Sequence, residues 1–247
     1  MKNKTLKNTM YQGKIVLITG ASRGVGLELT KHFIKHGATV IGLSRGESSF
    51  KDEQYKHFPV DIGDPESVTN CFKKEISKQF KRIDIVINNA AVMTSQYSMI
   101  MPIKNALDMV NVNLLGVFFV SREAAKLMRG KEQGRIINIG SMASSLEPIG
   151  DSVYAATKAG ISSLANVMAK ELSSMNITCN TLAITAIETD MLNSHSATAQ
   201  VKIKEIINSL PIPRMASADD ILNVIDFFAA DRSSYVTAQT IYLGGIN

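Results

Sequence analysis

The sequence is poor in cysteine and in charge of one sign, and each shortage excludes a class of protein. The two cysteines, Cys71 and Cys179, lie far apart and lack metal-ligand spacing, which argues against a small disulfide-held fold and against a metal site. Lysine and arginine exceed aspartate and glutamate by 27 − 22 = +5, and they form no basic tract. We therefore expect no nucleic-acid partner.

The chain also lacks long apolar runs. No stretch of 18 consecutive apolar residues occurs, and residues 1–13 (MKNKTLKNTMYQG) contain no apolar core of seven or more residues. The sequence therefore predicts no membrane contact and no secretory signal. We expect a cytoplasmic protein whose cysteines stay reduced.

The composition that remains is that of an ordinary globular protein. The chain has 247 residues, of which 45% are hydrophobic and 20% are charged. Single α/β domains often reach about 250 residues. We expect one domain over residues 12–247, preceded by a flexible polar arm at residues 1–11.

Short apolar runs alternate with segments of helical spacing from end to end. The runs predict strands at 14–19, 38–43, 56–60, 83–88, 134–140, 176–184 and 240–243. The segments predict helices at 24–36, 65–80, 102–128, 152–174, 198–209 and 218–230. This alternation is typical of parallel strands joined by helical crossovers. We expect a single doubly wound, Rossmann-type α/β domain, with a seven-stranded parallel sheet and helices on both faces.

A glycine-rich turn, TGASRGVG at 19–26, links the first expected strand to the first expected helix. Glycines at such a place allow a tight turn and close approach of a pyrophosphate, whose charge the helix N-terminus favours. Three residues, rather than one, separate the first two glycines, and a purely structural turn stays an alternative. The candidate cofactor-binding residues of the turn are Gly20, Ser22, Arg23, Gly24, Val25 and Gly26.

The end of the second expected strand decides which dinucleotide fits. An acidic residue there would bind a free ribose 2′-hydroxyl and favour NAD, but the strand ends in Leu43-Ser44-Arg45. Ser44, Arg45 and Arg23 could together hold a 2′-phosphate, although both arginines could equally be ordinary surface residues. We therefore expect NADPH (NADP⁺) as the cofactor.

A tyrosine and a lysine share one face at the start of a later helix. Tyr154 and Lys158, in YAATK, are four residues apart, and a nearby cation favours the phenolate form of a tyrosine. Ser141, directly after the fifth expected strand, could bind a substrate carbonyl. Taken alone, a Tyr-x-x-x-Lys pair is common and means little.

The whole motif set, however, resembles the short-chain dehydrogenase/reductase family from about residue 13 to the C-terminus. The likeness is nearest to 3-oxoacyl carrier-protein reductases and related ketoreductases. The matching motifs are TGASRGVG at 19–26, Asp61, NNAA at 88–91, Asn113 in NVNLLG, Ser141 in INIGSMAS, and YAATK at 154–158.

The resemblance implies a role for each matching residue. Tyr154 would be the general acid, Lys158 would lower its pKa and bind the nicotinamide ribose, and Ser141 would orient the carbonyl. Asn113 would hold a water that links Lys158 to solvent. Further cofactor contacts would come from Asp61, Ile62, Asn89, Ala90, Ala91, Ile187 and Thr189.

The sequence departs from the family pattern in two places. Ile184 and Thr185 replace the usual Pro-Gly pair before the nicotinamide contacts. Glu132 and Met175 stand where the carrier-protein reductases tend to have arginines that meet an acidic carrier. Whether an acyl carrier protein delivers the substrate therefore stays open.

These observations predict an NADPH-dependent carbonyl reductase or alcohol dehydrogenase acting on a small-molecule carbonyl or alcohol. A 3-oxoacyl thioester is one candidate substrate, and a sugar or polyol is another. A dinucleotide-binding regulator without catalysis is the alternative from a different class, and the retained Asn113, Ser141, Tyr154 and Lys158 argue against it. By resemblance we also expect a homotetramer.

Overall fold

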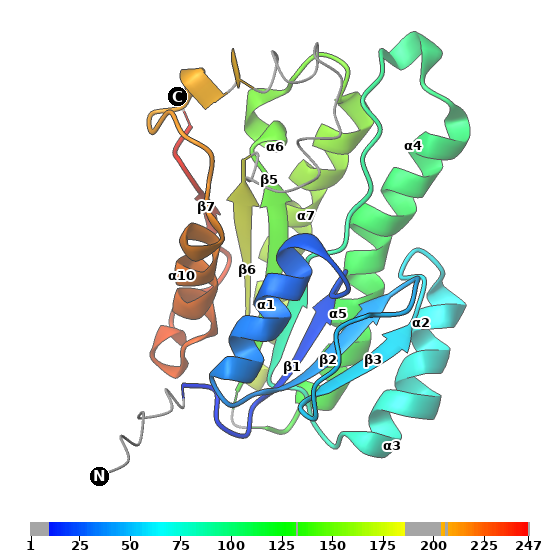
Figure 1. The fold of residues 1–247 in the computed structure, drawn as a ribbon, viewed down its shortest axis with the longest axis vertical. Coiled ribbons are helices and arrows are strands. Elements are labelled where there is room, and N and C mark those ends of the chain that lie inside the picture. Colours follow the sequence, from blue (N-terminus) through cyan, green and yellow to red (C-terminus); the bar gives the residue numbers. More distant parts are fainter. Residues whose placement is uncertain (1–9, 132, 186–203, 206, 247) are drawn as a thin grey trace.

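A single parallel β-sheet organises the molecule (Figure 1). The computed structural model describes residues 10–131, 133–185, 204–205 and 207–246. The strand order is β3-β2-β1-β4-β5-β6-β7, and every neighbouring pair is parallel. The strands are β1 (Ile15–Thr19), β2 (Thr39–Ser44), β3 (Tyr55–Pro59), β4 (Ile85–Asn88), β5 (Gly134–Ser141), β6 (Ile177–Ile184) and β7 (Thr240–Tyr242). The predicted seven-stranded sheet is confirmed.

Helices cover both faces of this sheet, as the alternation predicts. Figure 1 shows α1 and α10 in front of the sheet and α5 and α7 behind it. The longer helices are α1 (Gly24–Lys35), α2 (Pro65–Cys71), α4 (Ile103–Val110), α5 (Gly116–Met128), α7 (Ser152–Leu172) and α10 (Ala218–Ala229). Shorter turns are α3 (Ser77–Gln79), α6 (Ala143–Leu146), and the 3₁₀ segments η2 (Ser98–Ile100), η4 (Ser173–Met175) and η5 (Asp231–Ser233). Of the helix expected at 198–209, only residues 204–205 and 207–209 are described.

Successive side chains of each strand enter two separate cores. Leu17 of β1 packs with the helices behind the sheet, in a core that includes Val68, Val120 and Ala165. Val16 and Ile18, its neighbours in the strand, enter the core under α1 and α10. Both faces are therefore buried, which explains why the strands read as continuous apolar runs.

Two long helices contain π-helical segments that periodicity does not predict. The expected helix at 65–80 is divided by η1 (Phe72–Ile76), and the expected helix at 102–128 is divided by η3 (Asn111–Leu115). Segments of this kind often occur at functional sites. The second one contains Asn113.

The helix Ile103–Met128 has the length and composition needed to cross a membrane, which the sequence-based expectation of no such segment did not foresee. The mean hydropathy of its most apolar 18-residue window is 1.3, and 28% of that window is buried. In the fold, its α5 half packs against β4, β5 and α2. Several apolar side chains of the helix are exposed, among them Ile103, Leu107 and Phe118, while Met109 is buried.

The start of the described chain is tied to the domain. Tyr11, expected to belong to a mobile arm, is 2% exposed, and its hydroxyl donates to Asp226 Oδ1 at 2.6 Å. His32 Nε2 contacts the same oxygen at 2.8 Å. Tyr11 therefore packs with the domain, while residues 1–9 of the expected arm lie outside the described residues.

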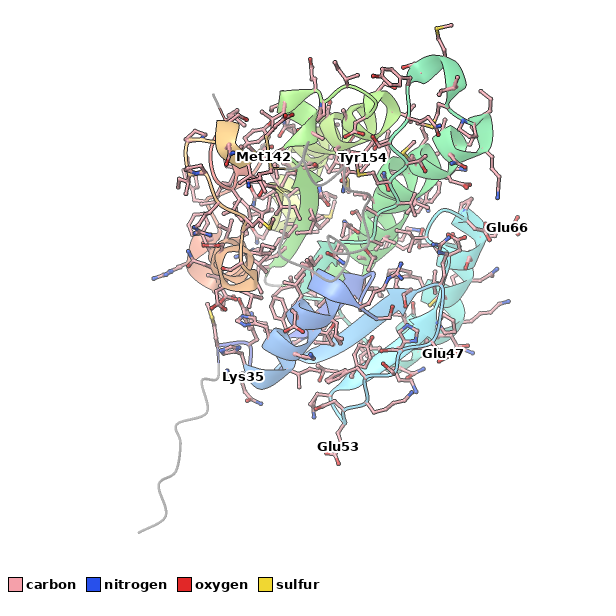
Figure 2. The ribbon with its side chains drawn as sticks, turned by 45° about the horizontal axis from the view of Figure 1, so that its top comes forward. Lys35, Glu47, Glu53, Glu66, Met142 and Tyr154 are labelled. Carbon is pink, nitrogen blue, oxygen red and sulfur yellow. The ribbon has the colours of Figure 1, made fainter. Side chains whose placement is uncertain are left out.

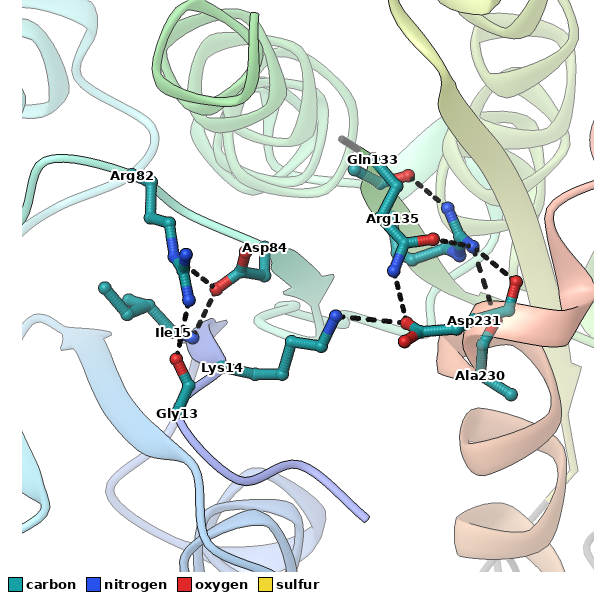
Figure 3. Close-up of polar contacts among 10 residues, drawn as sticks. Gly13, Lys14, Ile15, Arg82, Asp84, Gln133, Arg135, Ala230 and Asp231 are labelled. Atoms are coloured by element: carbon teal, nitrogen blue, oxygen red, sulfur yellow. Dashed lines mark hydrogen bonds and ion pairs between the residues drawn. The ribbon is translucent and has the colours of Figure 1, made fainter. Parts of the chain in front are cut away.

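A polar cluster closes the end of the sheet where the strands begin (Figure 3). Asp84 accepts from Ile15 N at 2.7 Å, and Asp231 pairs with Lys14 at 3.1 Å. The guanidinium of Arg135 is buried and donates to the carbonyl oxygens of Ala230 and Asp231. This polar end leaves the opposite edge, where the strands finish, for the ligand.

Candidate active site

The backbone of the turn after β1 favours glycine at its key positions. Gly20 and Gly24 have φ of +69° and +53°, which favour glycine. A Cβ on Gly26 would lie 2.1 Å from the carbonyl oxygen of Gly20. The turn is also fixed to β2, because Gly20 N donates to Leu43 O at 2.7 Å. It leads directly into α1, so the free N–H groups of that helix face the crevice.

The loop after β4 is joined to this turn across the point where the strand order reverses. The Thr19 hydroxyl accepts from the backbone N–H groups of Asn89 and Ala90, both at 3.0 Å. The Asn89 amide donates back to Thr19 O at 3.0 Å. Sequence reasoning overlooked Thr19, although it is the first residue of the glycine-rich motif. Parallel sheets bind dinucleotides at such a reversal.

The residues expected at the adenine follow β3. Asp61 is exposed, and its Oδ1 accepts from Gly63 N at 2.9 Å. Ile62 is buried, and its carbonyl oxygen would lie 2.9 Å from a Cβ on Gly116. Ala91, from the loop after β4, is exposed. These residues all border the same edge of the sheet.

At the end of β2, cationic side chains stand where a carboxylate would favour NAD. Arg45 and Arg23 are exposed, and within the described residues neither forms an ion pair. Ser44, the last residue of β2, is half-buried. The glycine cradle and these side chains fit a nicotinamide dinucleotide, and the arginines suit a phosphate on its ribose.

Ser141, Tyr154 and Lys158 come together at the carboxyl end of β5. β5 ends at Ser141, and α7 begins at Ser152, which brings the first turns of α7 back over that strand. Figure 2 shows Tyr154 in the same region as Met142, the residue after Ser141. Lys158 Nζ is 5.8 Å from the centroid of the Tyr154 ring and donates to Ile139 O at 2.8 Å. The structure thus brings the three expected side chains to one place.

Burial dominates the electrostatics of this group. Burial raises the pKa of Tyr154. A hydrogen bond from the neighbouring Ser141 hydroxyl lowers this pKa, and the Asp151 carboxylate raises it. Burial also lowers the pKa of Lys158 to about 8. The net shift of the Tyr154 pKa is therefore upward, because the phenol is withdrawn from water, and a lowering of that pKa by Lys158 stays a prediction. A neutral phenol is the form that can donate a proton.

Asn113 is fully buried and belongs to the π-helical segment η3. Its side-chain amide exchanges two hydrogen bonds with the backbone of Val92, both at 2.8 Å, and lies 3.4 Å from the Thr157 hydroxyl. It therefore fixes the loop after β4 beside α7. The expected water between Asn113 and Lys158 stays a prediction.

Ile184, one of the two residues that replace the Pro-Gly pair of the family, lies next to Ser141. Ile184, the last residue of β6, pairs in register with Ser141, and its carbonyl oxygen accepts from Met142 N at 2.9 Å. Ile187 and Thr189, expected at the nicotinamide amide, lie outside the described residues. Among the residues that are described, no group of three His, Cys, Asp or Glu side chains could hold a metal ion.

A cavity of about 410 Å³ lies between the loop after α6 and the outer side of α7. Its walls are small or apolar side chains of α7 together with Pro148 and Ile149, and Glu147 is the one charged residue among the described residues of the lining. Ser144 and Ala155, the neighbours of the Ser141 and Tyr154 region, also contribute.

Comparison with known proteins agrees with this geometry. A family model described as short chain dehydrogenase matches residues 14–200. The 3-oxoacyl-[acyl-carrier-protein] reductase FabG of Escherichia coli (strain K12) is 33% identical over 241 residues, which cover 95% of this chain and 97% of that protein. FabG of Vibrio cholerae is 32% identical over 243 residues, again covering 95% and 97%.

Solved structures share the fold. A short chain dehydrogenase from Leptospira borgpetersenii with bound NAD⁺ has a TM-score of 0.87 and 26% identity, and the match covers 99% of this chain and 96% of that one. The ligand-free aldohexose dehydrogenase of Thermoplasma acidophilum has a TM-score of 0.86 and 24% identity, with coverage of 96% and 95%.

Fold, glycine turn and relatives together define an NAD(P)-dependent oxidoreductase. The chain belongs to the short-chain dehydrogenase/reductase family.

The buried Lys158 predicts a specific dependence of stability on pH. Its pKa of about 8 in the folded protein lies below that of the unfolded chain, so above pH 8 the unfolded state holds the proton more tightly. Stability contributed by this group therefore rises between pH 8 and about pH 10.5. The difference in unfolding free energy, wild type minus Lys158→Met, should grow over this window by up to about 3 kcal/mol.

Urea unfolding measures this difference in unfolding free energy. The unfolding is followed by far-ultraviolet circular dichroism, because the chain has no tryptophan whose fluorescence could report on it. Protein concentration is held constant throughout. Lys35→Met, at an exposed position, is the control and should give a profile parallel to wild type. A constant difference for Lys158→Met from pH 7 to 10 would contradict a buried cation.

Proposed function

We propose that the protein is an NADPH-dependent carbonyl reductase that also catalyses the reverse alcohol oxidation. The observation that carries this is the convergence of Ser141, Tyr154 and Lys158 at the carboxyl edge of the sheet. The glycine turn reaches the same edge from β1. Substrate and dinucleotide would thus meet at the edge where the strands end.

The side chains divide the acid–base work. When bound, the nicotinamide supplies the hydride. Ser141 donates a hydrogen bond to the carbonyl oxygen and orients it, and keeps its own proton. Tyr154 holds its proton at the phenol oxygen, because burial favours the neutral form, and gives it to the developing alkoxide. The cation of Lys158, close to the ring, stabilises the phenolate that remains.

The dinucleotide would lie across the reversal between β1 and β4. Gly20, Gly24 and Gly26 would admit the pyrophosphate, Asn89 and Ala90 would line the ribose, and Lys158 would bind the nicotinamide ribose. Arg45, which follows Ser44, and Arg23 of the glycine-rich turn form no ion pair with any described residue, and they support a 2′-phosphate, because a guanidinium binds phosphate by paired hydrogen bonds.

A 3-oxoacyl thioester is the substrate class that we favour, since the relatives at 33% identity are named for that reaction. Met175, where carrier-protein reductases tend to have an arginine, is half-buried against the core and offers an acidic carrier no cation. Glu132 lies outside the described residues. We therefore propose the thioester without assigning a carrier protein, and a sugar or polyol is the alternative substrate.

We also propose a homotetramer. The outward side of α4 and α5 exposes Ile103 by 75%, Leu107 by 56% and Phe118 by 38%. Met99 and Ile100, just before α4, are exposed by 98% and 63%. Contiguous apolar surface of this kind is rare on monomers and marks an interface.

Sedimentation velocity tests the assembly. Wild type should sediment as a tetramer at micromolar concentration, and Leu107→Glu should shift it to smaller species, because a charge in an apolar interface is costly. Lys35→Glu introduces the same charge on the distant surface of α1 and should leave the tetramer intact. A monomeric wild type would end this proposal.

Cofactor choice is tested by titrating both reduced dinucleotides. Wild type should bind NADPH more tightly than NADH. Arg45→Ala should weaken NADPH by about 1.5–3 kcal/mol, typical of a charged hydrogen bond, and change NADH little. Arg232→Ala, at the opposite end of the sheet, serves as the control. Equal or tighter binding of NADH by wild type would refute the preference.

Turnover on a panel of acyl thioesters, sugars and diketones, followed by NADPH absorbance, tests reaction and substrate together. We expect a 3-oxoacyl thioester to be reduced fastest. On that substrate Tyr154→Phe should lower kcat by about 10²–10⁴, yet leave NADPH bound. Lys158→Ala should impair both, and the double variant should be far from additive because the two groups act as one unit. Near-normal turnover by Tyr154→Phe would overturn the mechanism.

A further inference from the structure

A histidine that no family motif covers touches the side chain at the end of β2. His57 lies on β3, the strand paired with β2, and its Nε2 is 2.8 Å from Ser44 Oγ. Ser44 follows Leu43, whose carbonyl oxygen accepts from Gly20 of the glycine turn. His57 is therefore one hydrogen bond removed from the position that reads the 2′ substituent of a dinucleotide.

The hydrogen bonds of Ser44 fix the direction of this contact. Ser44 Oγ is also 3.1 Å from Gly46 O, which can only accept. A hydroxyl has one proton, so a serine that donates to Gly46 must accept from His57 Nε2–H. The other ring nitrogen of His57, Nδ1, is buried and has no hydrogen-bond partner among the residues that the structure describes. Its lone pair is then a site where a proton can bind.

The surroundings keep the neutral form of His57 dominant without a ligand. Its ring is 6.2 Å from that of Tyr55, which in turn packs 5.4 Å from Phe50. Burial lowers the pKa of His57, Glu47 raises it, and Lys51 lowers it. Burial also raises the pKa of Tyr55, so this phenol stays neutral. Arg45 follows Ser44 in the chain and is exposed.

We propose that His57 is a positioning residue for the 2′-phosphate of NADPH, holding Ser44 so that its hydroxyl proton points to the phosphate and adding a positive charge when protonated. The inference rests on the proposed use of NADPH. On binding, the phosphate takes the place of Gly46 O as the acceptor of the Ser44 proton, while His57 continues to donate to Ser44. A phosphate dianion then favours the second proton on Nδ1.

A free 2′-hydroxyl gains much less from this arrangement. Ser44 can bond to it, but an uncharged hydroxyl draws no benefit from a protonated His57. The chain of donors from His57 through Ser44 to phosphate also strengthens each bond in it. His57 should therefore favour NADPH over NADH, and should do so more strongly at lower pH.

The test measures dissociation constants of NADPH and NADH by calorimetry between pH 6 and 8.5. His57→Phe removes donor and charge and should weaken NADPH about tenfold, with NADH changed less than about twofold. His57→Gln keeps an N–H donor without titrating. It should match wild type for NADPH at pH 8.5 but lose the gain in affinity at pH 6. The titration of the phosphate itself is common to both proteins, so it cancels in this comparison.

The control is His36→Gln, because His36 bonds to His32 at the far end of α1 and should not change either constant. An unchanged NADPH/NADH ratio in His57→Phe, or parallel pH profiles of wild type and His57→Gln, would overturn the inference. If, in that case, Arg45→Ala still lost the preference for NADPH over NADH, the proposal that NADPH is the cofactor would stand. A wild type that binds NADH as tightly as NADPH would overturn both.

Discussion

The close approach of two loops at the reversal of strand order is the constraint on which the site depends. Thr19 and Asn89 hold the turn after β1 against the loop after β4 through mutual hydrogen bonds. The backbone of α1 comes so near Gly20 that no side chain fits at position 26. This contact forms the floor of the crevice and fixes α1 relative to β4. Both the dinucleotide edge and the loop that Asn113 anchors take their positions from it.

Burial of the acid–base pair Tyr154 and Lys158 opposes the stability of the fold. Lys158 is buried and donates a hydrogen bond to Ile139 O, so its ammonium is held where water is scarce. Withdrawal from water also keeps Tyr154 protonated. In a solvent-exposed Tyr–Lys pair, both groups would titrate near their ordinary pKa values, and neither group would shift the pKa of the other by much. Burial thus makes the two side chains one functional unit, at some expense of stability.

The sequence predicted the sheet because its signals are local. A strand buried on both faces, such as β1, is an almost continuous apolar run. In the turn that follows it, glycine stands at position 26, where a Cβ would collide with the Gly20 carbonyl oxygen. The roles of Ser141, Tyr154 and Lys158 follow from the order of the motifs along the chain. Their local spacing alone is too common to predict a catalytic site. By contrast, the bonds of Asn113 to Val92 and of Ser44 to His57 join separate segments, and no periodicity contains them. Burial of Tyr11 and the raised pKa of Tyr154 likewise depend on the finished packing.

The anchoring of Tyr11 has a practical consequence for the orientation of the protein on a support. The side chain is fastened to α10 where the strands begin, the edge opposite the catalytic group (Figure 1). Gly244 and Gly245 instead lie against Leu210, Pro211 and Ile212, beyond the ends of the strands. If the protein were attached to a solid support through the chain before Tyr11, the reactive edge would therefore face the solution. Attachment after Gly245 would crowd it.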